Sequence, residues 1–102
     1  MNLGDTIVTL RETRGLKQKE LAVKADITQA YLSQIENNKK EPNLSTLKEI
    51  GEVLQVPVPL IFFMSMDETD FSPGKKEAFQ MLHPLIKNLI KDYFVDTITP
   101  AQ

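Results

Sequence analysis

Twenty residues near the start of the chain, QKELAVKADITQAYLSQIEN at 18–37, most strongly limit what it can fold into. Leu21, Ala22 and Ala25 share one face of a short helix, and Leu32 and Ile35 share one face of the next. The few residues between these groups leave room only for a turn. The stretch therefore predicts two short amphipathic helices, about 18–25 and 28–37, packed against each other.

Helical spacing of apolar residues continues on both sides of this pair. Residues 3–10 predict a first helix, and Gly15 is typical of the position that ends one. A fourth helix is expected to begin near Ser45, with the Ser45 hydroxyl capping its first turn. The residues that we expect this helix to bury are Leu44, Leu47, Ile50, Val53 and Leu54. A proline-initiated fifth helix over 60–64 follows, and no segment is convincing as a strand.

The last third of the chain differs from the first two thirds. Residues 65–73 are polar and rich in helix breakers, which predicts a linker between a domain at 1–64 and a helical tail at 74–102. The apolar stripe of the tail is too wide for a lone surface helix in water. Pro84 interrupts it, so either the helix kinks there or two helices form a hairpin.

Composition excludes several classes of function. The chain of 102 residues has no cysteine, so disulfides, thiol catalysis and cysteine-bound zinc are excluded. His83 has no catalytic partner, and we expect no enzyme activity, metal or cofactor. Neither a signal peptide nor a membrane span is expected, which indicates a cytoplasmic protein. Residues 11–40 hold seven basic and four acidic side chains, a balance of +3, so this part can face a polyanion.

Residues 3 to about 64 resemble the helix-turn-helix family of lambdoid phage repressors and Cro proteins, the XRE-like family. The resemblance lies in TLRETRGLKQKELAVKADITQAYLSQIENNKKEPNLSTLKEIGEVLQV. It implies an all-α, five-helix, lambda-repressor-like DNA-binding domain followed here by a C-terminal helical element. Asp26 and Asn38 stand where the family usually has glycine, and both tolerate the left-handed backbone conformation. Gly51 stands where alanine is more usual, which weakens that helix unless a close contact requires glycine.

The helix that begins after the expected N-cap Thr28 is the candidate reader of DNA. If Leu32 and Ile35 point inward, the opposite face carries amides and small side chains. The resemblance implies that this face enters the major groove. We expect contacts to bases from Gln29, Ala30, Ser33 and Gln34, and contacts to phosphates from Gln18, Thr28, Tyr31, Asn37, Lys39 and Lys40. A solvated face with incidental amides is the alternative. Arg11 and Glu36 match a pair that forms an internal ion pair in this family, so Arg11 is expected to be structural.

One recognition module of this size buries little surface on DNA, and the family's solution is a dimer that reads a palindrome. The tail residues expected to form the dimer are Phe79, Leu82, Leu85, Ile86, Leu89, Ile90 and Tyr93. Alternatively, the tail folds back on its own domain. The favoured function is a sequence-specific regulator of transcription, with repression expected, acting on double-stranded DNA. The alternative is an antitoxin-like or antagonist-controlled protein whose tail binds another protein.

Overall fold

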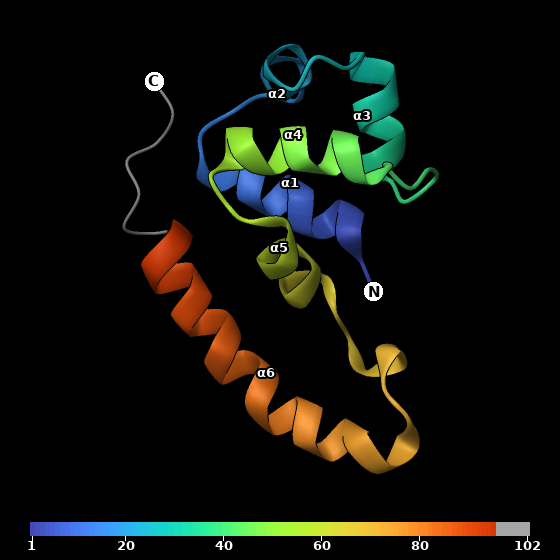
Figure 1. Cartoon of the computed structure of the whole chain (residues 1–102), viewed down its shortest axis with the longest axis vertical. Coiled ribbons are helices and arrows are strands. Elements are labelled where there is room, and N and C mark those ends of the chain that lie inside the picture. The colour runs from blue at the N-terminus through green and yellow to red at the C-terminus, as the bar shows by residue number, and fades with distance from the viewer. Residues whose placement is uncertain (96–102) are drawn as a thin grey trace.

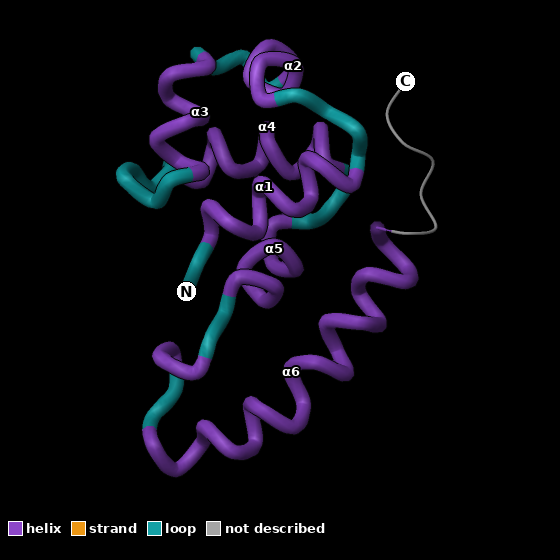
Figure 2. The backbone as a smooth tube through the Cα atoms, turned by 180° about the vertical axis from the view of Figure 1, so that it is seen from behind, coloured by secondary structure: helices purple, strands orange, loops and turns teal. Residues whose placement is uncertain are grey.

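The computed structural model describes residues 1–95, and these residues form helices and connecting segments without any strand (Figures 1 and 2). The α-helices are α1 Leu3–Thr13, α2 Gln18–Lys24, α3 Gln29–Glu36, α4 Leu44–Leu54, α5 Val58–Ser65 and α6 Lys76–Ile90. Two 3₁₀ turns, η1 Glu68–Asp70 and η2 Pro73–Lys75, separate α5 from α6, and a π-helical turn, η3 Lys91–Val95, continues α6. The expected all-α fold, with five helices and a C-terminal helix, is confirmed. The rest of the expected tail, 96–102, lies outside the described residues.

Helices α1 to α5 enclose one core, built from the residues that the apolar spacing selects. The core side chains include Ile7, Leu10, Leu21, Leu32, Ile35, Leu47, Ile50, Leu54 and Ile61. Helix α1 packs against α3 and α5, and α2 packs against α3. In Figure 1, α2 and α3 lie together at one end of the molecule, and α6 crosses the other end. The helix pair inferred from residues 18–37 is therefore a surface unit held from beneath by α1 and α4.

Turn residues confirm the local expectations around α3. The Thr28 hydroxyl accepts a hydrogen bond from the Tyr31 backbone N–H at 3.0 Å and caps α3. Asp26 and Asn38 have φ of 57° and 58°, the left-handed conformation that glycine usually supplies. Gly51 is explained by a close contact, because a Cβ atom there would lie 2.9 Å from the Val56 carbonyl oxygen.

Helix α4 begins at Leu44, near the expected Ser45, but the expected N-cap is wrong. Asn43, not Ser45, is its N-cap, since the Asn43 side chain accepts from the Thr46 backbone N–H at 2.8 Å. Leu44 therefore becomes the first helical residue, and it is 57% exposed rather than buried. Leu47 and Ile50 are buried as expected. The apolar spacing therefore predicts the buried face of the helix correctly, although it does not identify the capping residue.

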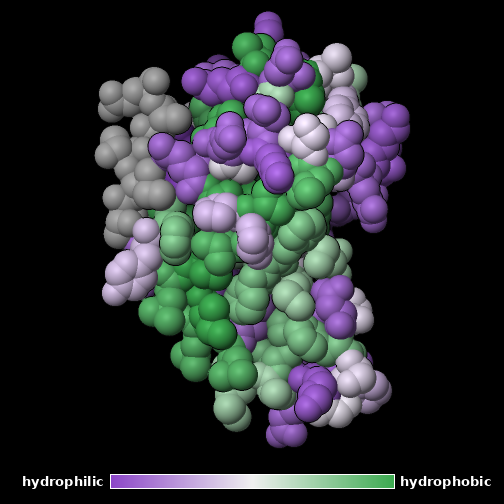
Figure 3. Space-filling view, viewed as in Figure 1, coloured by the Kyte–Doolittle hydropathy of each residue, from purple (hydrophilic) through white to green (hydrophobic). Residues whose placement is uncertain are grey.

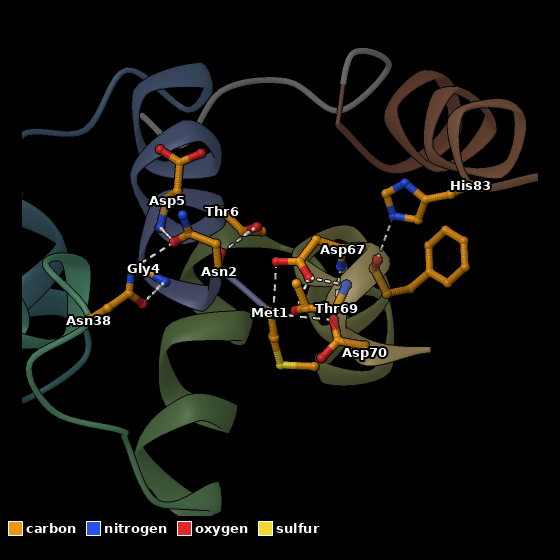
Figure 4. Close-up of polar contacts among 11 residues, drawn as sticks. Met1, Asn2, Gly4, Asp5, Thr6, Asn38, Asp67, Thr69, Asp70 and His83 are labelled. Carbon is orange, nitrogen blue, oxygen red and sulfur yellow. Dashed lines mark hydrogen bonds and ion pairs between the residues drawn. The ribbon is translucent and has the colours of Figure 1, made fainter. Parts of the chain in front are cut away.

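A polar cluster holds the segment between α5 and α6 (Figure 4). Asp67 accepts hydrogen bonds from the Thr69 backbone N–H at 2.9 Å and from the Thr69 hydroxyl. The Met1 ammonium lies 2.9 Å from Asp67 Oδ2 and 3.2 Å from Asp70 Oδ2. The Thr69 hydroxyl and the Met1 ammonium hold the pKa of the Asp67 carboxyl at about 2. The segment after α5 is thereby tied to the start of α1.

Helix α6 is continuous through Pro84, so the hairpin expected as one alternative is wrong. Its far end packs against the first five helices, where Ile90 and Val95 join the buried core. Arg14, which is only 2% exposed, fixes this end. Its Nε donates to Leu54 O at 2.7 Å, Nη1 to Val95 O at 2.8 Å and Nη2 to Phe94 O at 2.7 Å. One guanidinium thus binds the last carbonyls of α4 and of η3 together.

Candidate DNA-binding site

Helix α3 is buried along one face and open along the other. Leu32 and Ile35 are fully buried in the core, on the face that the sequence assigns to packing. Gln29 and Ala30 lie exposed at the N-terminal end of the helix, and Ser33 and Gln34 are half-buried one turn later. Helix α3 lies at the edge of the molecule (Figure 1), and the exposed Gln29 and Ala30 at its start are accessible to a ligand.

A chain of side-chain hydrogen bonds joins the start of α2 to the start of α3. Gln18 Nε2 donates to Glu36 Oε1 at 2.9 Å, which fixes the Gln18 amide with its oxygen facing α3. Gln29 Nε2 then donates to Gln18 Oε1 at 3.3 Å. The bond to Gln18 occupies one N–H of the Gln29 amide and leaves its other N–H and its oxygen for a ligand. Gln18 and Gln29 therefore form one surface.

The ion pair expected between Arg11 and Glu36 is present at the base of this chain. Arg11 Nε lies 2.9 Å from Glu36 Oε2 and Nη2 lies 3.2 Å from Glu36 Oε1, a two-pronged contact that fixes both planar groups. Arg11 Nη1 also donates to Leu16 O at 3.0 Å. Arg11 is thus committed to internal contacts. The buried Glu36 carboxylate has a basic partner and a Gln18 donor, so its charge is compensated.

The end of α3 carries a second group of candidate residues. Asn37 Nδ2 donates to the Ser33 backbone carbonyl at 2.8 Å and lies 3.4 Å from Ser33 Oγ, so the Asn37 side chain is held against the preceding turn of α3. Backbone N–H groups of Lys39 and Lys40 both donate to Gln34 O, which curls the loop back over the helix end. The side chains of Lys39 and Lys40 are exposed. The loop that carries these two lysines therefore lies at the C-terminal end of α3.

Not every candidate residue is equally open. Tyr31 is half-buried and packs against the core, and the Thr28 hydroxyl already serves the helix cap. Asn38 has a positioning role that sequence reasoning missed: its Oδ1 accepts from Gly4 N at 2.9 Å, and its Nδ2 donates to Asn2 Oδ1 at 2.7 Å (Figure 4). These bonds hold the loop that carries Lys39 against the start of α1. The only sequence signal for Asn38 was its place where glycine is usual.

The tail residues expected at a dimer interface fall into two groups. Ile90 is buried in the core of its own chain, and Phe79 is half-buried beside Phe71 and His83. The other members of the expected set are exposed, namely Leu82, Leu85, Ile86, Leu89 and Tyr93. Where α6 runs in Figure 1, the space-filling view from the same side shows a continuous hydrophobic surface (Figure 3).

Within residues 1–95, no group of three histidine, cysteine, aspartate or glutamate side chains is arranged to hold a metal ion. Among the helices of the same residues, none is long and apolar enough to cross a membrane.

Comparisons with known proteins agree with the geometry of α2 and α3. The family model described as helix-turn-helix matches residues 7–61. The immunity repressor protein of Bacillus phage phi105 is 38% identical over 61 residues, which cover 60% of this chain and 42% of that repressor. An uncharacterized HTH-type transcriptional regulator of Sinorhizobium fredii, y4dJ, is 34% identical over 70 residues, 68% of this chain and 88% of its own length.

Similarity to one relative extends into the tail. The HTH-type transcriptional regulator SinR of Bacillus licheniformis is 28% identical over 101 residues, which cover 98% of this chain and 84% of SinR. No solved structure matches the chain. Because the family match spans more than half of the 102 residues and includes the open helix α3, the chain belongs to the helix-turn-helix family of DNA-binding transcriptional regulators.

Proposed function

We propose that the protein is a sequence-specific repressor that acts in the cytoplasm and binds a palindromic operator as a dimer. The observation that carries the proposal is the open face of α3, where amides stand at the end of the molecule and Leu32 and Ile35 secure the helix from behind. Carbon and amide groups can contact base edges in the major groove without being captured by the nearest phosphate. The relative named as an immunity repressor supports the sign of regulation.

The contacts of each side chain suggest its role on DNA. Gln29 and Gln34 are assigned to base edges, where a glutamine can pair bidentately with adenine for about 1–3 kcal/mol of discrimination. Ala30 is assigned to a thymine methyl group, and Ser33 to a base edge beside it. Gln18, held by Glu36, is assigned to a phosphate next to the base that Gln29 contacts.

The other phosphate contacts come from the rim of the same face. Lys39 and Lys40 on the loop after α3 are assigned to phosphates, together with Asn37 at the helix end and Thr28 and Tyr31 near its start. Each lysine–phosphate contact releases about one counterion and steepens the dependence of affinity on salt by about one unit of slope. These contacts orient the protein but carry no sequence information.

Dimerisation completes the proposal, since a single module of about 600–1,000 Å² rarely gives tight, specific binding. The exposed leucines of α6 form an apolar surface that a second copy can cover. A foreign protein on this surface is the competing reading. Sedimentation of the purified chain distinguishes the two possibilities, because a homodimer forms without any other component whereas a complex with a foreign protein does not.

Selection of bound sites from random duplex DNA tests the reading role of α3. We expect the unchanged chain to select a palindrome, and Gln29→Ala and Gln34→Ala each to change base preference at a particular pair of symmetric positions. Lys40→Ala is the matched control on the same surface, expected to weaken all sequences alike and to lower the salt slope by about one. Uniform weakening by both glutamine variants, with unchanged preferences, would remove them from the reading role.

A further inference from the structure

Helix α6 has two neighbouring apolar faces, and among residues 1–95 one of them packs against the rest of the chain. On the inner face, the Phe79 ring stacks on the Phe71 ring with centroids 4.6 Å apart. His83 Nε2 lies 2.9 Å from the Phe63 carbonyl oxygen, and Ile90 is buried. The neighbouring face, about a quarter turn round the helix, carries a second set of apolar residues that are exposed in the part of the chain that the structure describes.

We call this second set the outer seam, defined as Ala78, Leu82, Leu85 and Leu89. Its leucines are 53%, 61% and 55% exposed in chain order. The spacing along the seam alternates between four and three residues, the alternation by which two helices interlock their side chains along a common line. Pro84, which lacks the N–H needed for a helical hydrogen bond, lies off this line, so its disruption faces away from the seam.

We propose that the outer seam pairs with the same seam of a second copy in antiparallel orientation, about a two-fold axis between Leu82 and Leu85. This inference rests on the proposed dimer and specifies how its two helices meet. In that register Leu82 lies opposite Leu85 of the second copy, and Ala78 lies opposite Leu89 of the second copy. Each pair occurs twice, as the symmetry of a two-fold interface requires.

Charges at the two ends of the seam favour the antiparallel orientation. Lys75 lies three residues before Ala78, and Asp92 lies three residues after Leu89. An antiparallel pair brings the Lys75 end of each helix to the Asp92 end of the other, whereas a parallel pair in register would place like charges together. Antiparallel packing also aligns the positive end of each helix dipole with the negative end of its neighbour.

The shape of the surface supports the same register. A cavity of about 290 Å³ opens beside Ala78 and Leu82, and its other walls include Phe71, Phe79 and Ile86. Ala78, the smallest residue of the seam, lies at the edge of this cavity, and the register places Leu89 of the second copy opposite Ala78. A large side chain thus meets a small one at both ends of the pair, which keeps the helices evenly spaced.

The chain has no cysteine, so introduced thiols report the register directly. The probe is a mixture of Ala78→Cys and Leu89→Cys chains, one of them carrying a mass tag, combined under reducing conditions and then oxidised. We expect a disulfide between the two different chains, because the register brings these positions within bonding reach. Each variant alone is expected to stay uncross-linked, since identical positions then lie 11 residues, or roughly 16 Å, apart along the helix.

A mixture of Gln80→Cys and Lys87→Cys chains provides the matched control. These two positions are related by the same two-fold axis but lie on the other side of α6, so we expect no cross-link. Sedimentation of the reduced samples records whether dimers form at all. Dimers that cross-link within single-variant samples, or that fail to cross-link in the mixture, overturn the antiparallel register while leaving the dimer and its operator binding in place. Monomers at all concentrations overturn the dimer and the register together, whereas base selection by α3 is measured separately.

Discussion

Replacing Gly4 by alanine is the sharpest test of how the fold holds helix α3. Gly4 lies in the first turn of α1, where its backbone N–H donates to Asn38 Oδ1 at 2.9 Å. A Cβ atom at this position would lie 2.6 Å from the Ile35 carbonyl oxygen and closer still to that of Glu36. Both oxygens belong to the backbone of α3. Neither can rotate away as the end of a flexible side chain would, so α1 and α3 must separate.

The size of the effect follows from two opposing terms. Overfilling a packed site costs about 1–3 kcal/mol, and backbone contacts as close as these favour the upper end. The higher helix propensity of alanine stabilises the folded state by at most about 1 kcal/mol. We therefore expect Gly4→Ala to lower the free energy of unfolding by about 2–3 kcal/mol. For a domain of this size, that corresponds to a fall in Tm of roughly 8–24 °C.

Urea unfolding followed by circular dichroism measures the effect, with an unchanged dependence on urea showing that the unfolded state is unaffected. Gly74→Ala is the control, because a Cβ atom there meets nothing within 4 Å, and its stability is expected to be unchanged or slightly raised. If Gly4→Ala were as stable as Gly74→Ala, the close approach of α1 to the end of α3 would be refuted.

Two further predictions concern the segments that attach the tail. Arg14→Met should lower the free energy of unfolding by about 2–4 kcal/mol in thermal melts, because three carbonyls lose a charged donor and two of them belong to the end of the tail. A loss of stability smaller than that of an ordinary surface substitution would contradict the proposed role of Arg14 in holding the tail. Asp67 has its pKa lowered from 3.8 to about 2 in the folded chain, so its contribution to stability is present above pH 3.8 and is lost as the pH falls towards 2. Tm measured between pH 5 and pH 2 should therefore fall more steeply for the unchanged chain than for Asp67→Asn, and parallel curves would contradict this account.

The helices around the candidate site could be predicted because their signals are local. The spacing of Leu32 and Ile35 fixes which face of α3 is buried, and Thr28 is a strong N-cap at the right distance before them. The N-cap of α4 could not be predicted because Asn43 and Ser45 are both good capping residues, two positions apart. Either cap leaves Leu47 and Ile50 buried, so the apolar pattern alone could not choose between them.

Features that depend on distant parts of the chain could not be predicted in this way. Pro84 removes a hydrogen bond at a cost of about 3 kcal/mol, and only contacts on both sides of it decide whether the helix continues. Here Phe79 packs before it and Ile90 after it, both against the same chain, so a single helix is retained. The burial of Arg14 depends on carbonyls 40 and 81 residues away, and nothing near it in the sequence indicates them.

The C-terminal end of α1 connects the tail to α3 through Arg11 and the C-cap residue Arg14. Arg11 grips Glu36 at the end of α3, and Arg14 grips the carbonyls that end α4 and η3. Both contacts are buried or partly buried, so they are screened little by salt and tolerate little movement. In the proposed dimer, the outer seam and the reading face would therefore move as one body. The distance between the two half-sites of the operator would then be set by the fold itself rather than by the polar segment between α5 and α6.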